Sequence, residues 1–379
     1  MEYGNVLVLG DSGVGKSTLI NAVLGENAAK TGYGTEGTTK YLEVYTNDEI
    51  KLRLIDTVGF EPDFIKRKQA IDSVRKWSKD AAKVGDANSA INVIWFCVDG
   101  TSRKLFKQSI DSLIKATRVF KSVPVIAVIT KSYSEPDREE NIQMVREAFA
   151  KYRKKLDLEC IIPVVAQQFN ITDNVCAPES GLDELLEKTR ALVPTGIKAA
   201  RSDMDKYKLN MMNGFAQGLI GTSTAAGATV GLVNIIPMSD AAVLSTLELA
   251  EVEGLAKIYN VKKNDDSNKL IKKIVELGTV SAIAKAACGA ILKAIPVAGQ
   301  VANSAVAGTF VAAIGEGSRY IFEQIYQGNK SVNDLDWVEK VLNEKLSDAS
   351  IKKAQEAFKG LKETSTKDDI AKAIQGLFK

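Results

Sequence analysis

The sequence of 379 residues contains no histidine and only four cysteines. Without histidine, a Ser-His-Asp triad, a histidine general base and a histidine metal ligand are all excluded. The cysteines are widely spaced and form no Cys-x-x-Cys pair, so neither a disulfide framework nor a zinc site is expected. They are Cys97, Cys160, Cys176 and Cys288. Any chemistry must therefore come from carboxylates, lysine, arginine, hydroxyls, backbone amides and a bound metal.

An excess of one charge is also lacking, because the formal net charge is only +3 with acids and bases interspersed. Overall charge therefore indicates no nucleic-acid partner. A local basic patch at Lys66-Arg67-Lys68 is the alternative, and we favour a solvated helix face for this cluster. The start, Met1-Glu2-Tyr3, has neither the basic residues nor the cleavage site of a secretory signal. Together with the unpaired cysteines, this favours a cytoplasmic location.

A glycine-rich run, Gly-Asp-Ser-Gly-Val-Gly-Lys-Ser, occupies Gly10–Ser17, between the apolar stretch Val6–Leu9 and the helix-like segment Thr18–Leu24. This strand, loop and helix context is the one that a phosphate-binding P-loop requires. Glycines let successive N–H groups turn around phosphates, Lys16 adds a cation, and the hydroxyl of Ser17 can ligate Mg2+ at a positive helix end. The predicted nucleotide-binding residues here are Gly10, Asp11, Ser12, Gly13, Val14, Gly15, Lys16, Ser17 and Thr18.

A second motif, Asp-Thr-Val-Gly, follows the apolar run Leu52–Ile55. Asp56, at the carboxyl end of a strand, can hold Mg2+ directly or through water. Gly59 can present its N–H group to a terminal phosphate. Because the Asp-Thr-Val-Gly motif follows the P-loop, we predict that it forms part of the same nucleotide site.

Between the two motifs lies the Gly/Thr-rich stretch Thr31–Lys40, in the place where a nucleotide-dependent switch loop would lie. A threonine there can close on Mg2+ and the terminal phosphate, and so order the loop. Thr39 is the first choice and Thr38 the second. The alternative is a flexible polar loop.

These three motifs, in this order and spacing, resemble the translation-factor-related class of P-loop GTPases over the first half of the chain. The switch Gly37-Thr38-Thr39 and the strand Ile94–Val98, which ends in Asp99-Gly100, resemble the Era, septin and immunity-related groups of that class. The resemblance implies GTP binding and hydrolysis with Mg2+. The predicted catalytic residues are Lys16, Thr39 and Gly59, and the predicted metal ligands are Ser17, Thr39 and Asp56.

The base-reading segment departs from the pattern of this class, which usually carries Asn/Thr-Lys-x-Asp. The chain has Thr130-Lys131-Ser132-Tyr133, so a tyrosine stands where the guanine-selecting carboxylate would be. Thr130 and Lys131 are predicted to bind the nucleotide, and Glu135 or Asp137 could supply a carboxylate from nearby. The run Val165-Ala166-Gln167 resembles the final base-binding motif only loosely. The resemblance, rather than the motif itself, favours GTP over ATP.

A second departure is Phe60, directly after Asp56–Gly59, where small signalling GTPases carry a water-orienting glutamine. A phenyl ring cannot orient water, which predicts slow intrinsic hydrolysis until another loop, a second protomer or a partner supplies a group. Glu61 and Arg103 are candidates for that group, and an ordinary surface charge is the alternative for each.

Apolar runs alternate with amphipathic stretches from residue 1 to about residue 195. The expected strands are Asn5–Leu9, Tyr41–Tyr45, Leu52–Ile55, Ile91–Val98, Val123–Ile129 and Ile161–Val165. The expected helices are Phe64–Lys79, Lys104–Phe120, Asn141–Leu156 and Leu182–Leu192. This alternation predicts an α/β P-loop nucleotide-binding domain over residues 1–195, with a mostly parallel sheet and helices on both faces.

Residues 196–379 show helical patterns only, which predicts a second, all-α domain. Met211–Ser239 and Ala294–Gly315 contain no charged residue. Both are rich in small residues, and Pro237 and Pro296 interrupt them. We therefore favour two closely packed apolar helical hairpins, with conditional membrane insertion or docking, and a permanent membrane span, as alternatives.

The last segment, Val332–Lys379, is a charged helical segment. Its expected amphipathic helices are Asp336–Leu346 and Ile351–Leu361, and a further helix starts at Thr366.

The sequence as a whole predicts a Mg2+-dependent switch that binds GTP or GDP and hydrolyses GTP. The helical domain would respond to the bound nucleotide by self-assembly as a homo-oligomer or by conditional membrane contact. The expected location is the cytoplasm, with a peripheral membrane location as the alternative. Two alternatives stay open: a nucleotide-binding scaffold or partner-binding module with little turnover, and an ATPase.

Overall fold

A computed structural model describes most of the chain. The described residues are 3–25, 29–30, 42–57, 59–60, 63–85, 89–102, 107–172, 175–233, 241–279, 300–345, 356–358, 360, 362 and 364–375. The chain divides into two compact units, Met1–Lys208 and Leu209–Lys379. The division lies inside helix α5 (Leu182–Val233) rather than near residue 195.

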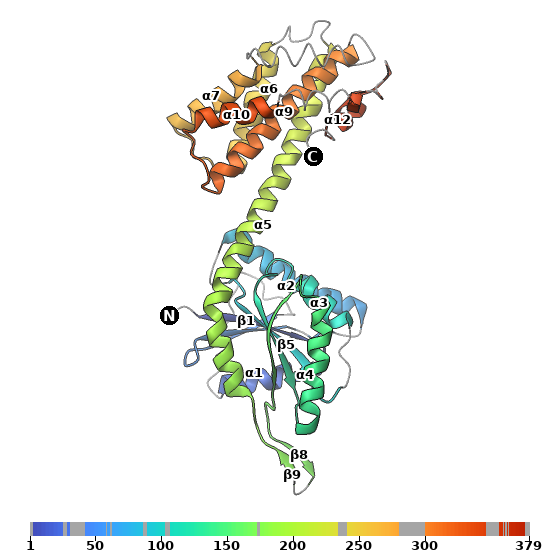
Figure 1. The fold of residues 1–379 in the computed structure, drawn as a ribbon, viewed down its shortest axis with the longest axis vertical. Coiled ribbons are helices and arrows are strands. Elements are labelled where there is room, and N and C mark those ends of the chain that lie inside the picture. Colours follow the sequence, from blue (N-terminus) through green and yellow to red (C-terminus); the bar gives the residue numbers. More distant parts are fainter. Residues whose placement is uncertain are drawn as a thin grey trace. The chain divides into compact units, whose positions relative to one another are not determined.

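The first unit is built on a sheet of seven strands (Figure 1). Their order across the sheet is β2 (Ala29–Lys30), β3 (Leu42–Asn47), β4 (Leu52–Thr57), β1 (Gly4–Gly10), β5 (Val93–Asp99), β6 (Pro124–Thr130) and β7 (Asp157–Pro163). The neighbouring strands β4, β1, β5, β6 and β7 are parallel to one another. At one edge of the sheet, β3 runs antiparallel to both of its neighbours, β4 and β2. Every residue of β1 and β6 is buried, as expected for strands covered on both faces.

Helices cover both faces of this sheet, which confirms the predicted α/β architecture. On one face, α2 (Phe64–Val84), α3 (Lys107–Ala116) and α4 (Glu135–Ala150) pack in one hydrophobic core, which Ala200 and Met204 of α5 also join. On the other face, α1 (Lys16–Leu24) and the start of α5 form a second core. Alternate residues of β1 enter the two cores, as the twofold period of a strand requires.

Some boundaries differ from those that the sequence predicts. The helix expected at Asn141–Leu156 is α4, which begins earlier because Pro136 suits a first helical turn and the acids there complement the positive helix end. The strand expected at Ile161–Val165 is β7, which ends at Pro163. A short hairpin of β8 (Phe169–Thr172) and β9 (Val175–Ala177) was not predicted.

All regular elements that the structure describes in the second unit are helices, as predicted. Beside the C-terminal part of α5 this unit contains α6 (Ala241–Ile258), α7 (Asp265–Thr279), α9 (Gln300–Tyr326), α10 (Leu335–Lys345) and α12 (Lys367–Gln375). α9 packs against α6, α7, α10 and α12, and its run from Val301 to Ser318 is buried. A Cβ atom on Gly227 would lie 2.7 Å from the side chain of Val311, so small residues bring α5 and α9 close together.

The uncharged stretches fall partly in these helices. Met211–Ser239 contributes the end of α5, and Ala294–Gly315 contributes the first half of α9. Among the helices that the structure describes, none has both the length and the hydropathy of a membrane span. Pro237, Pro296 and most of Ile351–Leu361 lie outside the described residues.

The predicted start of the last helix is confirmed at α12. The Thr366 hydroxyl accepts from the N–H group of Asp369, and the Asp369 carboxylate accepts from the N–H group of Thr366 at 2.9 Å. This reciprocal pair is a capping arrangement that begins the helix.

Candidate functional site: a phosphate-binding loop at the carboxyl edge of the sheet

The glycine-rich run forms a tight loop from the end of β1 to the start of α1. Gly13 and Gly15 take positive φ values of 77° and 94°, which a residue with a Cβ atom rarely adopts. A Cβ atom on Gly10 would lie 2.5 Å from the carbonyl oxygen of Cys97. These three glycines are therefore required by the geometry of the loop.

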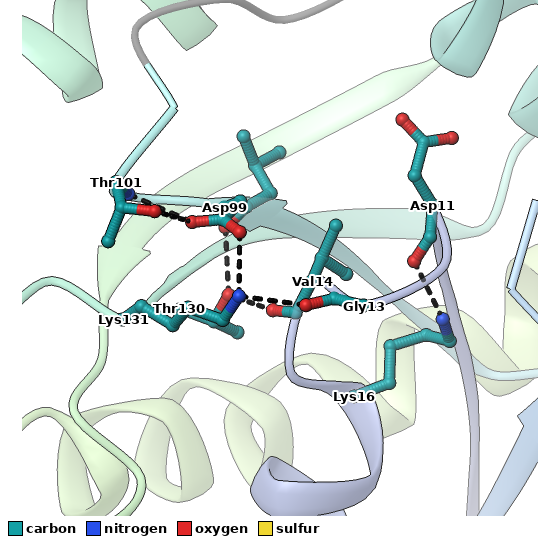
Figure 2. Close-up of polar contacts among 9 residues, drawn as sticks. Asp11, Gly13, Val14, Lys16, Asp99, Thr101, Thr130 and Lys131 are labelled. Carbon is teal, nitrogen blue, oxygen red and sulfur yellow. Dashed lines mark hydrogen bonds and ion pairs between the residues drawn. The ribbon is translucent and has the colours of Figure 1, made fainter. Parts of the chain in front are cut away.

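Lys16 lies beneath this loop with only 7% of its surface exposed. Its ammonium group donates to the carbonyl oxygen of Gly10 at 3.2 Å. It also donates to the carbonyl oxygen of Asp11 at 2.9 Å (Figure 2). The side chains of Ser17 and Thr18 are exposed on the first turn of α1. The first N–H groups of a helix have no partner inside it, so this turn can bind an anion.

Asp11 contacts Lys16 through its backbone carbonyl oxygen and not through its carboxylate. The carboxylate points away from Lys16 (Figure 2) and accepts a hydrogen bond from Ser109 of α3 at 2.5 Å. The P-loop is thus fastened to a helix that the sequence did not connect to it.

The second motif lies directly beside the loop. Thr57 donates to the carbonyl oxygen of Val8 at 2.9 Å and so holds β4 against β1. Asp56 Oδ1 is buried and has no hydrogen-bond partner among the described residues. Burial raises the pKa of Asp56 to about 6, although the nearby Lys16 charge lowers it. A Cβ atom on Gly59 would lie 2.7 Å from both Lys16 Nζ and the backbone nitrogen of Ser12.

Phe60 is a core residue with 1% of its surface exposed. Its N–H group donates to the Gly10 carbonyl at 3.0 Å, and its own carbonyl accepts from the Ser12 N–H group at 3.3 Å. The ring packs in the core beneath the sheet and so does not face the loop's ligand side. The predicted switch residues Thr38 and Thr39, and the candidates Glu61 and Arg103, lie outside the described residues.

The segment after β6 reaches the same loop. Thr130 is buried, and its hydroxyl hydrogen-bonds the Val14 carbonyl as well as the Val98 carbonyl at 3.0 Å. Lys131 has a positive φ of 54°, and its ammonium group donates to the Gly13 carbonyl at 2.8 Å and to Asp99 at 2.7 Å (Figure 2). Thr130 therefore braces the loop, whereas the stem of Lys131 lies beside it.

Asp99 ends β5, and the sequence assigned it no role. Burial raises its pKa, but hydrogen bonds from Lys131 and Thr101 outweigh that effect and hold the pKa below its ordinary value. Its charge therefore fixes the position of Lys131.

Tyr133, which the sequence places where a guanine-selecting carboxylate would be, contacts the β8 and β9 hairpin, and sequence reasoning missed this contact. The Tyr133 ring stacks on Phe169 of β8, with ring centres 4.2 Å apart and planes 15° from parallel. Arg138 of α4 donates to the Ser132 carbonyl at 3.1 Å and to the Ser180 hydroxyl at 3.4 Å. No local pattern could have revealed these partners, because only the fold brings them together.

A left-handed glycine loop, a lysine beneath it, a helix N-terminus and an aspartate on the neighbouring strand define a P-loop nucleotide-binding domain. The family of 50S ribosome-binding GTPases has a model that matches residues 5–131. These residues, with the motifs that they contain, are a P-loop GTPase domain, which confirms the predicted class.

Curated relatives match a similar part of the chain. GTPase Era of Vibrio parahaemolyticus is 28% identical over 167 residues, which cover 44% of this chain and 47% of that protein. GTPase Era of Pasteurella multocida is 27% identical over 165 residues, which cover 43% and 49%. The chain thus spans about half the length of the curated relatives it matches.

Solved structures include a septin GTPase domain from Chlamydomonas reinhardtii, with a TM-score of 0.37, 15% identity, and 54% of this chain and 98% of that chain covered. An Era solved in complex with MgGDPNP and a segment of 16S ribosomal RNA has a TM-score of 0.33, 24% identity, and 51% and 58% covered.

Proposed function

We propose that the chain is a Mg2+-dependent switch that binds and hydrolyses GTP, and that its helical unit is the output. The observation that carries the proposal is the loop itself, where left-handed glycines, Lys16 and the first turn of α1 converge on one anion site. The GTPase family of residues 5–131 supports guanosine triphosphate as the ligand.

The residues present fit Mg2+. Asp56 Oδ1 is a buried oxygen without a hydrogen-bond partner among the described residues, and the hydroxyl-bearing side chain of Ser17 is exposed. Mg2+ prefers oxygen ligands and is commonly held by one or two protein groups together with phosphate oxygens. When bound, the ion would neutralise charge on the phosphates. Thr39 remains the proposed third ligand.

Competition binding tests the nucleotide. A fluorescent GDP analogue bound to the full chain with Mg2+ should be displaced by GDP and GTP at concentrations at least about tenfold below those needed for ADP and ATP. Equal displacement by both bases would favour an ATPase or an unselective site. No binding of any nucleotide would contradict the proposal.

Slow hydrolysis without assembly is part of the proposal, because Phe60 lies in the core and cannot orient water. Multiple-turnover phosphate release should be measured over a range of protein concentrations. A specific rate that rises with concentration supports assembly-coupled hydrolysis. No turnover at any concentration would favour the scaffold alternative.

The helical unit presents an uncharged surface that suits self-assembly or conditional membrane contact. The α5 residues Gly214, Phe215, Gly218 and Thr222 are exposed, with Phe215 exposing 62% of its surface. Flotation with phospholipid vesicles in GDP and in a non-hydrolysable GTP analogue tests membrane contact, and sedimentation in the same states tests oligomerisation. Absence from the floating fraction in both states would contradict membrane contact.

The proposed location is the cytoplasm, with membrane contact as a conditional state. Nucleic acid is not part of this proposal, although the matching family is described as ribosome-binding and a solved Era is titled as an RNA complex. Co-sedimentation with ribosomal subunits tests that partner directly. Pelleting that depends on the bound nucleotide would add the ribosome to the proposed partners.

A further inference from the structure

Positive charge in the chain is concentrated in helix α2. Its 21 residues include seven lysines and arginines and two aspartates, whereas the formal net charge of the whole chain is only +3. The basic residues are Lys66, Arg67, Lys68, Arg75, Lys76, Lys79 and Lys83. Without this helix, the chain would carry more acidic than basic groups.

The side of α2 that faces away from the sheet is basic. Ala70, Val74 and Ala81 are buried in the core, so the opposite side of the helix faces solvent. Exposed residues on that side are Ile65, Lys68, Asp72, Lys76 and Lys83. The Asp72 carboxylate lies 3.5 Å from Arg75, and Asp80 is the one other acid of the helix. Lysine therefore outweighs carboxylate on this side.

Two large apolar side chains begin the helix beside these lysines. Phe64 exposes 75% of its surface and Ile65 exposes 65%. The Asp63 carboxylate accepts a hydrogen bond from the Lys66 N–H group at 2.9 Å and so caps the first turn that carries them. The exposed apolar pair is thus part of a formed helix and adjoins the basic side.

An anionic lipid surface matches both properties. Its headgroups attract lysine and arginine, and large apolar side chains insert at the boundary between the headgroups and the acyl chains. A solvated face would leave Phe64 and Ile65 in water. A nucleic acid would use the lysines, because its phosphates supply most of the affinity, but it would gain little from Ile65.

We propose that this surface of α2, formed by Phe64, Ile65, Lys68, Lys76 and Lys83, binds an anionic phospholipid surface. The lysines attract the headgroups, and the two apolar side chains insert between them. This contact lies in the first unit and needs anionic lipid, unlike the contact proposed for the uncharged surface of the helical unit. It does not depend on nucleotide binding.

Flotation of the full chain with vesicles of two compositions tests the inference. Vesicles of phosphatidylcholine with about 30% phosphatidylserine should bind the chain at least about tenfold more tightly than vesicles of phosphatidylcholine alone. Raising the salt from about 0.1 M to 0.5 M should weaken this binding by at least about tenfold, because salt screens the attraction. Equal flotation with both compositions, or none with anionic vesicles, would overturn the inference. Equal flotation would still support contact through the uncharged helical unit.

Charge reversal tests whether α2 makes the contact. K68E/K76E reverses two exposed lysines and should weaken binding to anionic vesicles by at least about tenfold. K188E/R190E changes the net charge of the chain equally, at exposed positions near the start of α5 on the other face of the sheet, and should have little effect. Equal losses in the two variants would show an effect of net charge alone and overturn the assignment to α2.

The apolar pair is tested without a change of charge. F64S/I65S should weaken binding to anionic vesicles by about fivefold or more, because inserted apolar area adds to the electrostatic attraction. I171S/V175S removes two exposed apolar side chains, with 52% and 53% of their surfaces exposed, from the β8 and β9 hairpin and should have little effect. Equal losses in the two variants would overturn the role of Phe64 and Ile65.

A nucleic acid is the competing partner for the same lysines. Titration of the parent chain and K68E/K76E with a short labelled RNA and a DNA duplex measures it. Affinity for nucleic acid that K68E/K76E loses, in a chain that does not float with anionic vesicles, would assign the surface to nucleic acid and overturn the inference.

Discussion

Two lysines serve the loop in different ways. Lys16 is buried beneath it and donates to its carbonyl oxygens, whereas Lys131 is fixed at its side by Asp99. Only Lys16 lies where a phosphate chain would replace the carbonyls as its partner. Of the two lysines, we therefore expect Lys16 to contribute more to nucleotide affinity.

We expect Lys16→Ala to weaken GDP binding by about tenfold to 100-fold, because it removes a charge-assisted hydrogen bond. Equilibrium binding of a fluorescent GDP analogue measures the loss. Lys115→Ala, which changes an exposed lysine at the end of α3, is the control and should have no effect. Equal affinities for the two variants would contradict the role of Lys16.

Phe60→Gln should not create a faster enzyme. The ring is buried in the core, so glutamine loses apolar burial and places an amide there, which should lower the free energy of unfolding by about 2–4 kcal/mol. Chemical denaturation and phosphate release measure the two effects. Phe60→Leu keeps the site apolar and should cost about 1 kcal/mol. A severalfold rate gain in the glutamine variant would show that the residue can turn toward the ligand.

At the scale of elements, α6 places two carboxyl groups inside the second unit. Burial raises the pKa of Glu248 to about 8. Burial, with Glu248 and Glu316 nearby, raises the pKa of Glu251 to about 9. Glu316 of α9 is itself paired with Arg319 at 2.8 Å. Both α6 groups are therefore neutral in the folded chain near pH 7.

A raised carboxyl pKa contributes stability that is present at low pH and is lost as the pH rises toward the folded value. Hydrogen exchange of α6 and α9, corrected for intrinsic rates, should therefore show weaker protection at pH 9 than at pH 6. Glu251→Gln removes the ionisable group. It should therefore reduce the difference in protection free energy between pH 6 and pH 9 by on the order of 2 kcal/mol. Glu253→Gln, at an exposed position of the same helix, is the control. An equal pH dependence in both variants would contradict the assignment to Glu251.

Helix α5 is longer than the helix that the sequence predicts. The sequence predicts a helix over Leu182–Leu192, yet α5 continues through Pro194 to Val233. A Cβ atom on Gly196 would lie 1.8 Å from the carbonyl oxygen of Asn92, so the glycine serves a close approach of α5 to the start of β5.

The whole molecule divides within α5, and the first unit needs the helix beyond residue 195. Asp203 accepts hydrogen bonds from Ser122 N at 2.7 Å and Ser122 Oγ at 3.0 Å, and Ala200 and Met204 are buried in the core. A fragment of residues 1–208 should bind GDP within about threefold of the full chain, because the described site lies inside it.

A fragment of residues 1–195 loses those contacts and should melt at least about 5 °C lower than the 1–208 fragment. Thermal melting followed by circular dichroism measures this difference. Equal melting temperatures would place the boundary of the folding unit near residue 195, as the sequence suggested.

The predictable part of this chain is local in sequence. The P-loop and Asp56–Gly59 each carry their chemistry in a few consecutive residues, and alternating strands and helices imply the sheet. Ser109, Arg138 and Phe169 carry no such signal, because each contacts its partner only after folding. The buried carboxyl groups of α6 were missed for the same reason, since a glutamate in a helix ordinarily faces water.

The hairpin has one practical consequence. Cys176 is exposed on β9, opposite Asn170 of the strand that carries Phe169. Among the other cysteines that the structure describes, Cys97 is buried and Cys160 is half-buried. Among the described cysteines, Cys176 is thus the exposed attachment point for a fluorophore on the hairpin, on the strand beside the one that carries Phe169.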